Sequence, residues 1–530
     1  MNKGRSVIGA ITMLLPMLIL QVACTRNFES INTNPYDVYD DELQGDFKLI
    51  GDPLVQSMLN IYVSNDVSVL QLQQNLMGDI FSGYMMTPSP FQDNRNNITY
   101  DLLDNWNDDA WLTAYGNVMP NCRFVMDKCR GKYPDFYAWA QIIRVLAMHR
   151  LSDIYGPVIY THYAIINEDR SIDYDSQEQA YDAFFKDLDS AVTALTLYVP
   201  SATDNRFKKF DLSYNGDYVK WIKLANTLRL RLALRISNVN PSRARKEGEA
   251  AINQTYGLLS TSDENFNINI APVTHPLNVI CNSWNDIRMG APMESLLCGY
   301  HDPRLPYYFV PSDTKDSIYQ GIRNGITITS KDVYAGFSKL AWQPSRIQLC
   351  TAAEAWFLLA EAALYSWKGA GDAKDNYEKG IYTSFRQYNI PVSRYDRYIN
   401  DDTLTAKAYS DPHNNLNNIP AGSPYLSKRT IKWVHNASVH EKLERIITQK
   451  WIAVFPDGQE AWSEFRRTGY PKLFPVVVNN SGGKISSTLF IRRIPFIQFE
   501  YATNPTGVKR AVSKLKGEDN GGTRLWWDKE

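Results

Sequence analysis

The sequence of 530 residues lacks an excess of charge of either sign. It carries 56 Lys and Arg against 57 Asp and Glu, which gives a formal net charge of -1 at pH 7. A surface that follows nucleic-acid phosphates normally needs a basic excess or a segment dense in Lys and Arg, so this balance argues against nucleic-acid binding. Hydrophobic residues make up 44% of the chain, which is enough apolar mass for a large core and excludes disorder for most of its length.

The common catalytic and cofactor motifs are also absent. The chain contains no H-E-x-x-H, G-x-S-x-G, G-x-x-x-x-G-K-[ST] or G-x-G-x-x-G pattern, so the usual hydrolase, kinase and dinucleotide-binding signatures are missing. The seven His residues are scattered along the chain and form no cluster with metal-ligand spacing. We therefore expect a protein that is not an enzyme and that requires no metal and no cofactor.

Cysteine is scarce, with six residues in all. Besides Cys24, the chain contains Cys122, Cys129, Cys281, Cys298 and Cys350. None belongs to a C-x-x-C pair, so a zinc ribbon or a thioredoxin-like centre has no support, and an odd number leaves at least one thiol free. A disulfide between Cys122 and Cys129 could form in an exported protein, but buried free thiols are the favoured interpretation.

Long hydrophobic runs are missing except at the N-terminus. Lys3 and Arg5 precede an uncharged apolar stretch that ends at Ala23 and is too short for a membrane span, so residues 1–23 are predicted to be a secretory signal peptide. Cys24 follows Val22 and Ala23, as in a bacterial lipobox, which predicts lipidation of Cys24; cleavage nearby with an unmodified Cys24 is the alternative. The mature chain 24–530 would then be anchored to a membrane without crossing it.

A recurring helix pattern is the strongest periodic signal. The segments 136–153, 218–237 and 351–367 each contain W-x-x-apolar-apolar, and the downstream segments 180–188 and 373–381 carry A-x-x-x-aromatic spacing. These are the two halves of a tetratricopeptide unit. The pattern predicts an all-α fold, a tetratricopeptide-like repeat frame with long irregular insertions and a few short strands. Trp139, Trp221 and Trp356 are predicted core residues, and Arg229, Arg231 and Arg235 are predicted to form a solvated helix rim.

Two stretches rich in aromatic residues, Pro and Asn interrupt this frame. The repeat helices are expected at about 131–256 and 350–390, the two insertions at about 78–115 and 257–345, and a C-terminal region of short helices and turns at 391–530. Binding residues tend to lie on long loops held by a rigid scaffold. We therefore expect the insertions to face a ligand and to converge on one side of the frame.

Aromatic residues with polar neighbours are the candidate ligand-binding residues. A sugar ring stacks its C–H face on Trp or Tyr while its hydroxyls need Asn, Asp, Gln or Arg in the same pocket. Trp284 in N-S-W-N-D-I-R and Trp106 in D-N-W-N-D have such neighbours. The predicted carbohydrate-binding residues are Trp284, Trp106, Trp342, Tyr334, Tyr84, Arg288 and Asn285. For any one of them, ordinary packing is the alternative.

Several segments, taken in order, resemble the SusD/RagB family over essentially the whole mature chain. They are N-T-N-P at 32–35, D-I-Y-G-P-V-I-Y at 153–160, K-W-I-K-L-A-N at 220–226, D-P-R-L at 302–305, A-E-A-W-F-L-L-A-E-A at 353–362, Q-K-W-I-A at 449–453 and R-I-P at 493–495. The resemblance implies a lipoprotein of the cell outer membrane that faces the exterior. It also implies capture of an oligosaccharide and its delivery to a SusC-like TonB-dependent transporter, without catalysis. Three alternatives remain: a peptide ligand, a surface glycoside hydrolase, and a scaffold that binds only the transporter.

Overall fold

A computed structural model describes residues 46–201, 205–313 and 318–529. The chain divides into two compact units, residues 1–49 and 50–530. The predicted signal peptide and Cys24 lie outside the described residues. Everything that follows concerns the second unit.

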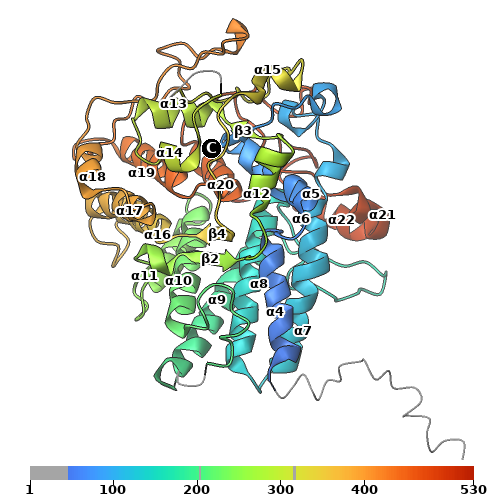
Figure 1. Ribbon diagram of the computed structural model, residues 1–530. Coiled ribbons are helices and arrows are strands. Elements are labelled where there is room, and N and C mark those ends of the chain that lie inside the picture. The colour runs from blue at the N-terminus through green and yellow to red at the C-terminus, as the bar shows by residue number, and fades with distance from the viewer. Residues whose placement is uncertain (1–45, 202–204, 314–317, 530) are drawn as a thin grey trace, which may run out of the picture. The chain divides into compact units, whose positions relative to one another are not determined.

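The predicted helix pairs are present (Figure 1). They are α8 (Pro134–Tyr155) with α9 (Gln177–Tyr198), α10 (Tyr218–Arg235) with α11 (Pro241–Ile252), and α16 (Ala352–Leu364) with α17 (Ala373–Gln387). Helix α10 also packs against α9 and α16, so the pairs follow one another as in a repeat array. The prediction of an all-α repeat frame with a few short strands is confirmed.

The local sequence explains the turn and the close packing of the third helix pair, α16 with α17. Gly369 and Gly371 adopt positive φ angles of 89° and 76°, which Gly tolerates without steric cost, and they form the turn. Asp372 then caps α17, because its side chain accepts a hydrogen bond from the backbone N–H of Asp375 at 2.9 Å. A Cβ atom at Gly380 would lie 2.7 Å from the ring of Phe357, so this small residue allows α16 and α17 to approach closely.

The frame tryptophans differ in their burial. Trp139 and Trp221 are fully buried, as predicted, and Trp139 stacks on Phe207 with ring centroids 4.0 Å apart. Trp356 is only half-buried, so its assignment to the core was wrong. Helix α16 directs Phe357 against its partner helix instead, and Trp356 donates its indole N–H to the carbonyl of Ser260 at 3.0 Å.

The arginines of α10 are buried, so the prediction of a solvated rim was wrong. Arg231 and Arg235 have relative exposures of 1% and 0%. They belong to a buried ion network with α8, α16, α19 (Val439–Ala453) and α20 (Gly458–Thr468). Its ion pairs include Arg231–Glu354 at 2.5 Å, Arg467–Glu361 at 2.6 Å, Arg235–Glu460 and Arg467–Glu464 at 2.7 Å, Arg235–Asp153 at 3.1 Å, Lys450–Glu460 at 3.2 Å and Lys450–Glu464 at 3.3 Å. Each buried charge is thereby paired, as burial requires.

The remaining elements surround this frame. Before α8 come α4 (Lys48–Ile61), α5 (Val67–Leu70), η1 (Gln71–Asp79), η2 (Phe91–Asn94), η3 (Asn97–Thr99), η4 (Asp104–Trp106), α6 (Asp109–Thr113), η5 (Ala114–Val118) and α7 (Met119–Cys129). The middle of the chain adds η6 (Val199–Ser201), η7 (Ser262–Glu264), α12 (Pro276–Asn278), η8 (Val279–Ser283), α13 (Ala291–Gly299), α14 (Leu305–Tyr308) and α15 (Lys331–Ala335). The C-terminal region adds α18 (Val392–Ile399), η9 (Asn415–Asn417), α21 (Gln498–Thr503) and α22 (Pro505–Val512). Of the helices in the described part of the chain, none has the length and apolar character needed to cross a bilayer.

Two small antiparallel sheets connect distant segments. β1 (Met85–Met86) pairs with β3 (Arg288–Met289), and β2 (Phe266–Asn269) pairs with β4 (Arg346–Cys350). Since β1 belongs to the first predicted insertion and β3 to the second, this pairing brings the two insertions together.

The five described cysteines, Cys122, Cys129, Cys281, Cys298 and Cys350, are free thiols. Burial raises the pKa of the Cys122 thiol to about 11, which makes it unreactive. The interpretation of these residues as free thiols is confirmed, although Cys298 is only partly buried.

Candidate functional site

The short turn of residues 284–288, which follows η8, is held in place by contacts from several segments. Asp286 accepts hydrogen bonds from the Ser89 hydroxyl at 2.8 Å and from the Gln71 amide at 3.3 Å. The Lys331 ammonium forms an ion pair with Asp286 at 2.7 Å and donates to the carbonyl of Trp284 at 2.7 Å. The turn is therefore fixed to η1, to the first insertion and to α15, which makes it a rigid support for the side chains it carries.

Two tryptophans at this turn are exposed. Trp284 directly follows η8 and has a relative exposure of 37%, and Trp342 has 70%. The strand-like segment that carries Trp342 runs along α12 and η8: Gln343 and Asn278 exchange two hydrogen bonds of 2.9 and 2.8 Å, and the Leu340 N–H donates to the Cys281 sulfur at 3.3 Å. Both tryptophans thus belong to chain segments beside one short helical segment, and both have apolar surface open to solvent.

Arg288 and Asn285 hold this turn together and present little surface to a ligand. Arg288 is fully buried, and its guanidinium donates to the carbonyls of Ala335 at 2.8 Å and Ile287 at 2.6 Å, as well as to the side-chain oxygen of Asn285. Burial lowers the pKa of Arg288. Asn285 adopts a φ of 62°, a left-handed conformation that Asn tolerates better than most residues. We assign both residues a positioning role rather than the direct contact expected from the sequence.

Tyr84 and Tyr334 are buried, which removes them from direct contact with a ligand in this structure. Tyr84 packs between Trp451 and Phe455, with ring centroids at 4.7 and 5.2 Å, and donates its hydroxyl to the carbonyl of Trp451. The hydroxyl of Tyr334 donates to Asp411 at 2.8 Å, and burial raises the pKa of Tyr334. Both rings were expected at the ligand because their neighbours in sequence are loop residues.

Trp106 is also nearly covered, with a relative exposure of 8%. Its ring meets Phe91 edge-on, with centroids 5.6 Å apart. Its polar neighbours Asp104 and Asn107 line a separate pocket of about 360 Å³ together with Asn480 and Asp519, so the polar side chains near Trp106 face a cavity that the ring itself does not line. Of the seven predicted residues, only Trp284 and Trp342 combine a large apolar face with substantial exposure.

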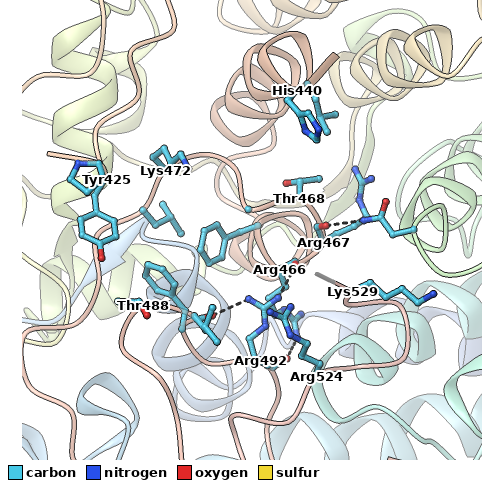
Figure 2. A pocket seen from close by; sticks show the side chains of 18 of the residues that line it. Tyr425, His440, Arg466, Arg467, Thr468, Lys472, Thr488, Arg492, Arg524 and Lys529 are labelled. Carbon is cyan, nitrogen blue, oxygen red and sulfur yellow. Dashed lines mark hydrogen bonds between the residues drawn. The ribbon is translucent and has the colours of Figure 1, made fainter. Parts of the chain in front are cut away.

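A pocket of about 710 Å³ lies in the C-terminal region (Figure 2), and sequence reasoning missed it. Its basic lining residues are His440, Arg466, Arg467, Lys472, Arg492, Arg524 and Lys529. A signal existed in the sequence: Phe465 directly precedes the doublet Arg466-Arg467, and Phe490 lies two residues before the doublet Arg492-Arg493. In the described residues, no group of three or more His, Cys, Asp or Glu side chains is arranged to hold a metal ion.

Comparison with known proteins identifies the family. A family model described as SusD-like, Susd and RagB outer membrane lipoprotein, matches residues 30–528. A chitin-binding SusD homolog from Flavobacterium johnsoniae is 46% identical, with a TM-score of 0.87 over 91% of this chain and 99% of that chain. SusD homologs from Bacteroides vulgatus and Bacteroides uniformis are each 35% identical, with TM-scores of 0.85 and 0.83 over 92% and 91% of this chain and 99% of theirs. Comparison with curated protein sequences gave no match. The chain therefore belongs to the SusD-like family of Susd and RagB outer membrane lipoproteins.

Proposed function

We propose that this protein captures an oligosaccharide at the cell outer membrane and delivers it to a partner SusC-like TonB-dependent transporter, without catalysis. The observation that carries the proposal is the pair of exposed tryptophans: Trp284, which directly follows η8, and Trp342, which precedes the residue hydrogen-bonded to Asn278 of α12. Flat indole faces bind the C–H face of a sugar ring at small entropic cost when the rings are already ordered. The turn that bears Trp284 is ordered by Lys331 and Asp286.

The ligand class follows from the comparison. The relative that is 46% identical over 91% of the chain is described as chitin-binding, and chitin is a neutral polymer of N-acetylglucosamine. Neutral sugars offer no charge for an ion pair, and stacking of their C–H faces on the two exposed indole rings needs none. We therefore propose chitin-type oligosaccharides as the first ligands to test. Modest affinity is sufficient, because tethering beside a transporter raises the effective concentration to roughly the mM range.

Trp284→Ala and Trp342→Ala are each expected to weaken binding of a chitin oligosaccharide by about 1 to 3 kcal/mol, by analogy with base–aromatic stacking. Isothermal titration calorimetry measures this loss, and thermal melts should show little change in stability because both side chains are exposed. Phe499→Ala is the matched control, since Phe499 is an aromatic residue on α21 with 55% exposure and should bind like the unmodified protein.

Two results would count against this proposal. Normal affinity in both tryptophan variants would remove the stacking site, and hydrolysis products after incubation with the glycan would make the protein an enzyme. Tight binding of peptides instead of oligosaccharides would keep the assembly but replace the ligand class.

Cys24→Ala is expected to move the protein from the membrane fraction to the soluble fraction. The reason is that Cys24 follows an apolar signal and small residues, and a diacylglycerol group supplies the two chains that stable anchoring requires. Fractionation followed by immunoblotting measures the change, with circular dichroism to check the fold. Retention of the variant in membranes would show that another segment anchors the protein.

A further inference from the structure

The basic pocket of the C-terminal region has an unusual charge distribution. Six Arg and Lys side chains line it, and none of its lining residues is Asp or Glu. Three of these cations form ion pairs with carboxylates that do not line the pocket. Arg467 pairs with Glu361 at 2.6 Å, while Arg492 and Arg524 both pair with Asp528. Within the described residues, the other three, Arg466, Lys472 and Lys529, take part in no ion pair.

Arg466 is the most unusual of these three cations, because its relative exposure is only 2%. Its guanidinium lies 3.5 Å from the centroid of the Trp462 ring and donates to the carbonyl of Arg492 at 2.8 Å and to the hydroxyl of Ser463 at 3.0 Å. Burial lowers the pKa of Arg466 to about 9, although the carboxylates of Asp153 and Asp528 oppose this shift, and the positive charge of Arg492 adds to the lowering. A buried cation held by neutral acceptors gains free energy when an anion binds nearby.

Much of the rest of the lining is apolar, although Asn238, Thr468 and Thr488 also belong to it. Phe465 and Phe490 meet edge-on with ring centroids 4.9 Å apart, and Leu473 and Tyr425 extend this surface. Phe490 has a φ of 62°, a costly conformation for a bulky residue that the surrounding contacts must maintain. Figure 2 shows Arg466, Arg492 and Arg524 close together, with Lys472 and Tyr425 in another part of the view. A volume of about 710 Å³ falls in the range of small-molecule sites.

We propose that this pocket binds an oxyanion, a sulfate, phosphate or carboxylate group, carried by a small molecule whose body packs on the Phe465 and Phe490 wall. The basic residues would hold the anion and the aromatic residues the ring or carbon chain. This site shares no residue with Trp284 and Trp342, so it goes beyond the proposed capture of a neutral glycan and its failure leaves that proposal intact.

Equilibrium dialysis of the mature protein with labelled inorganic sulfate, at constant ionic strength set with chloride, tests the inference. A single saturable site is expected. Unlabelled N-acetylglucosamine 6-sulfate and its uncharged parent N-acetylglucosamine, added as competitors, distinguish the source of the anion. Displacement at lower concentration by the sulfated sugar than by inorganic sulfate supports a carried oxyanion. Equal concentrations would keep the anion site but overturn the role of the Phe465 and Phe490 wall, and equal displacement by the uncharged parent would overturn recognition of the anion.

Lys472→Gln is expected to weaken sulfate binding by about tenfold, because it removes one charge-assisted hydrogen bond. Lys516→Gln is the matched control, since Lys516 is exposed and does not line the pocket. Arg466→Gln should weaken binding more, but its burial requires a thermal melt to show that the variant folds; Lys472→Gln keeps the test decisive if it does not. The absence of a saturable site, or equal binding by Lys472→Gln and Lys516→Gln, would overturn the inference.

Discussion

Glu460→Gln is expected to lower the free energy of unfolding by about 3 to 5 kcal/mol, the usual cost of removing one partner from a buried ion pair. The carboxylate of Glu460 is buried and accepts two hydrogen bonds of 2.7 Å from Arg235. Lys450 approaches the same carboxylate at 3.2 Å. A neutral amide would remove the carboxylate that Arg235 and Lys450 share, and so leave one positive charge uncompensated in a site closed to water.

Urea titration followed by circular dichroism measures this change. Glu378→Gln is the matched control, because Glu378 pairs with Lys374 at 2.7 Å on the surface of α17, where both side chains are partly exposed. Pairs of that kind contribute about 0.3 to 0.5 kcal/mol. Equal stability of the two variants would show that the buried network contributes no more than a surface pair.

Lowering the pH should reveal the same contribution of Glu460 to the free energy of unfolding. Burial alone would raise the pKa of Glu460, but the charges of Arg235, Arg231 and Lys450 outweigh it and lower the pKa to about 2, from an ordinary value of 4.5. A carboxyl group whose pKa is lower in the folded state stabilises the fold above its unfolded pKa and loses this effect as the pH falls through its folded pKa. The unmodified protein should therefore lose stability more steeply than Glu460→Gln between about pH 4.5 and pH 2.

Trp221→Ala is expected to destabilise the fold by about 3 to 5 kcal/mol, through the cavity that it leaves in the core. Trp221 is fully buried and packs against Phe266 and Tyr214, with ring centroids at 5.5 and 5.8 Å. Its indole N–H also donates to Asp211 at 2.7 Å, and this partly buried carboxylate would lose a partner.

Trp284→Ala is the comparison, because it removes the same side chain from an exposed position. Thermal melts of the two variants should differ widely, with Trp284→Ala close to the unmodified protein. A melt of Trp221→Ala that coincides with that of Trp284→Ala would mean that the centre of the repeat frame tolerates a large cavity.

The repeat frame could be predicted from the sequence because its signals are local. The helical spacing around Trp139 and Trp221 and the cap at Asp372 all lie within a few residues of the structure they determine. The buried network could not be predicted in this way. Arg231 meets Glu354 across 123 residues and Arg235 meets Glu460 across 225 residues, so a helix that carries three arginines gives no indication of which partners would bury them.

The predicted binding residues show the same difference between local signals and contacts with distant residues. Trp284 and Tyr84 both lie in loop-rich stretches with polar neighbours, and nothing near them in sequence distinguishes their burial. Tyr84 is buried because Trp451, 367 residues away, supplies the carbonyl that accepts its hydroxyl. The sequence predicted which residue types could bind a sugar, and distant contacts decided which of them face solvent.

The buried ion network limits which fragments of this protein can fold alone. In most repeat proteins each unit contacts only its neighbours, so stability is nearly a sum over units and fragments can fold alone. Here Glu460, from a helix near the end of the chain, neutralises Arg235 of a helix near the middle. A nascent chain that has not yet reached α20 holds Arg235 without this partner, so the repeat helices cannot complete their packing as a separate module. Because Arg235 is neutralised by Glu460, the repeat helices can complete their packing only after α20 is present.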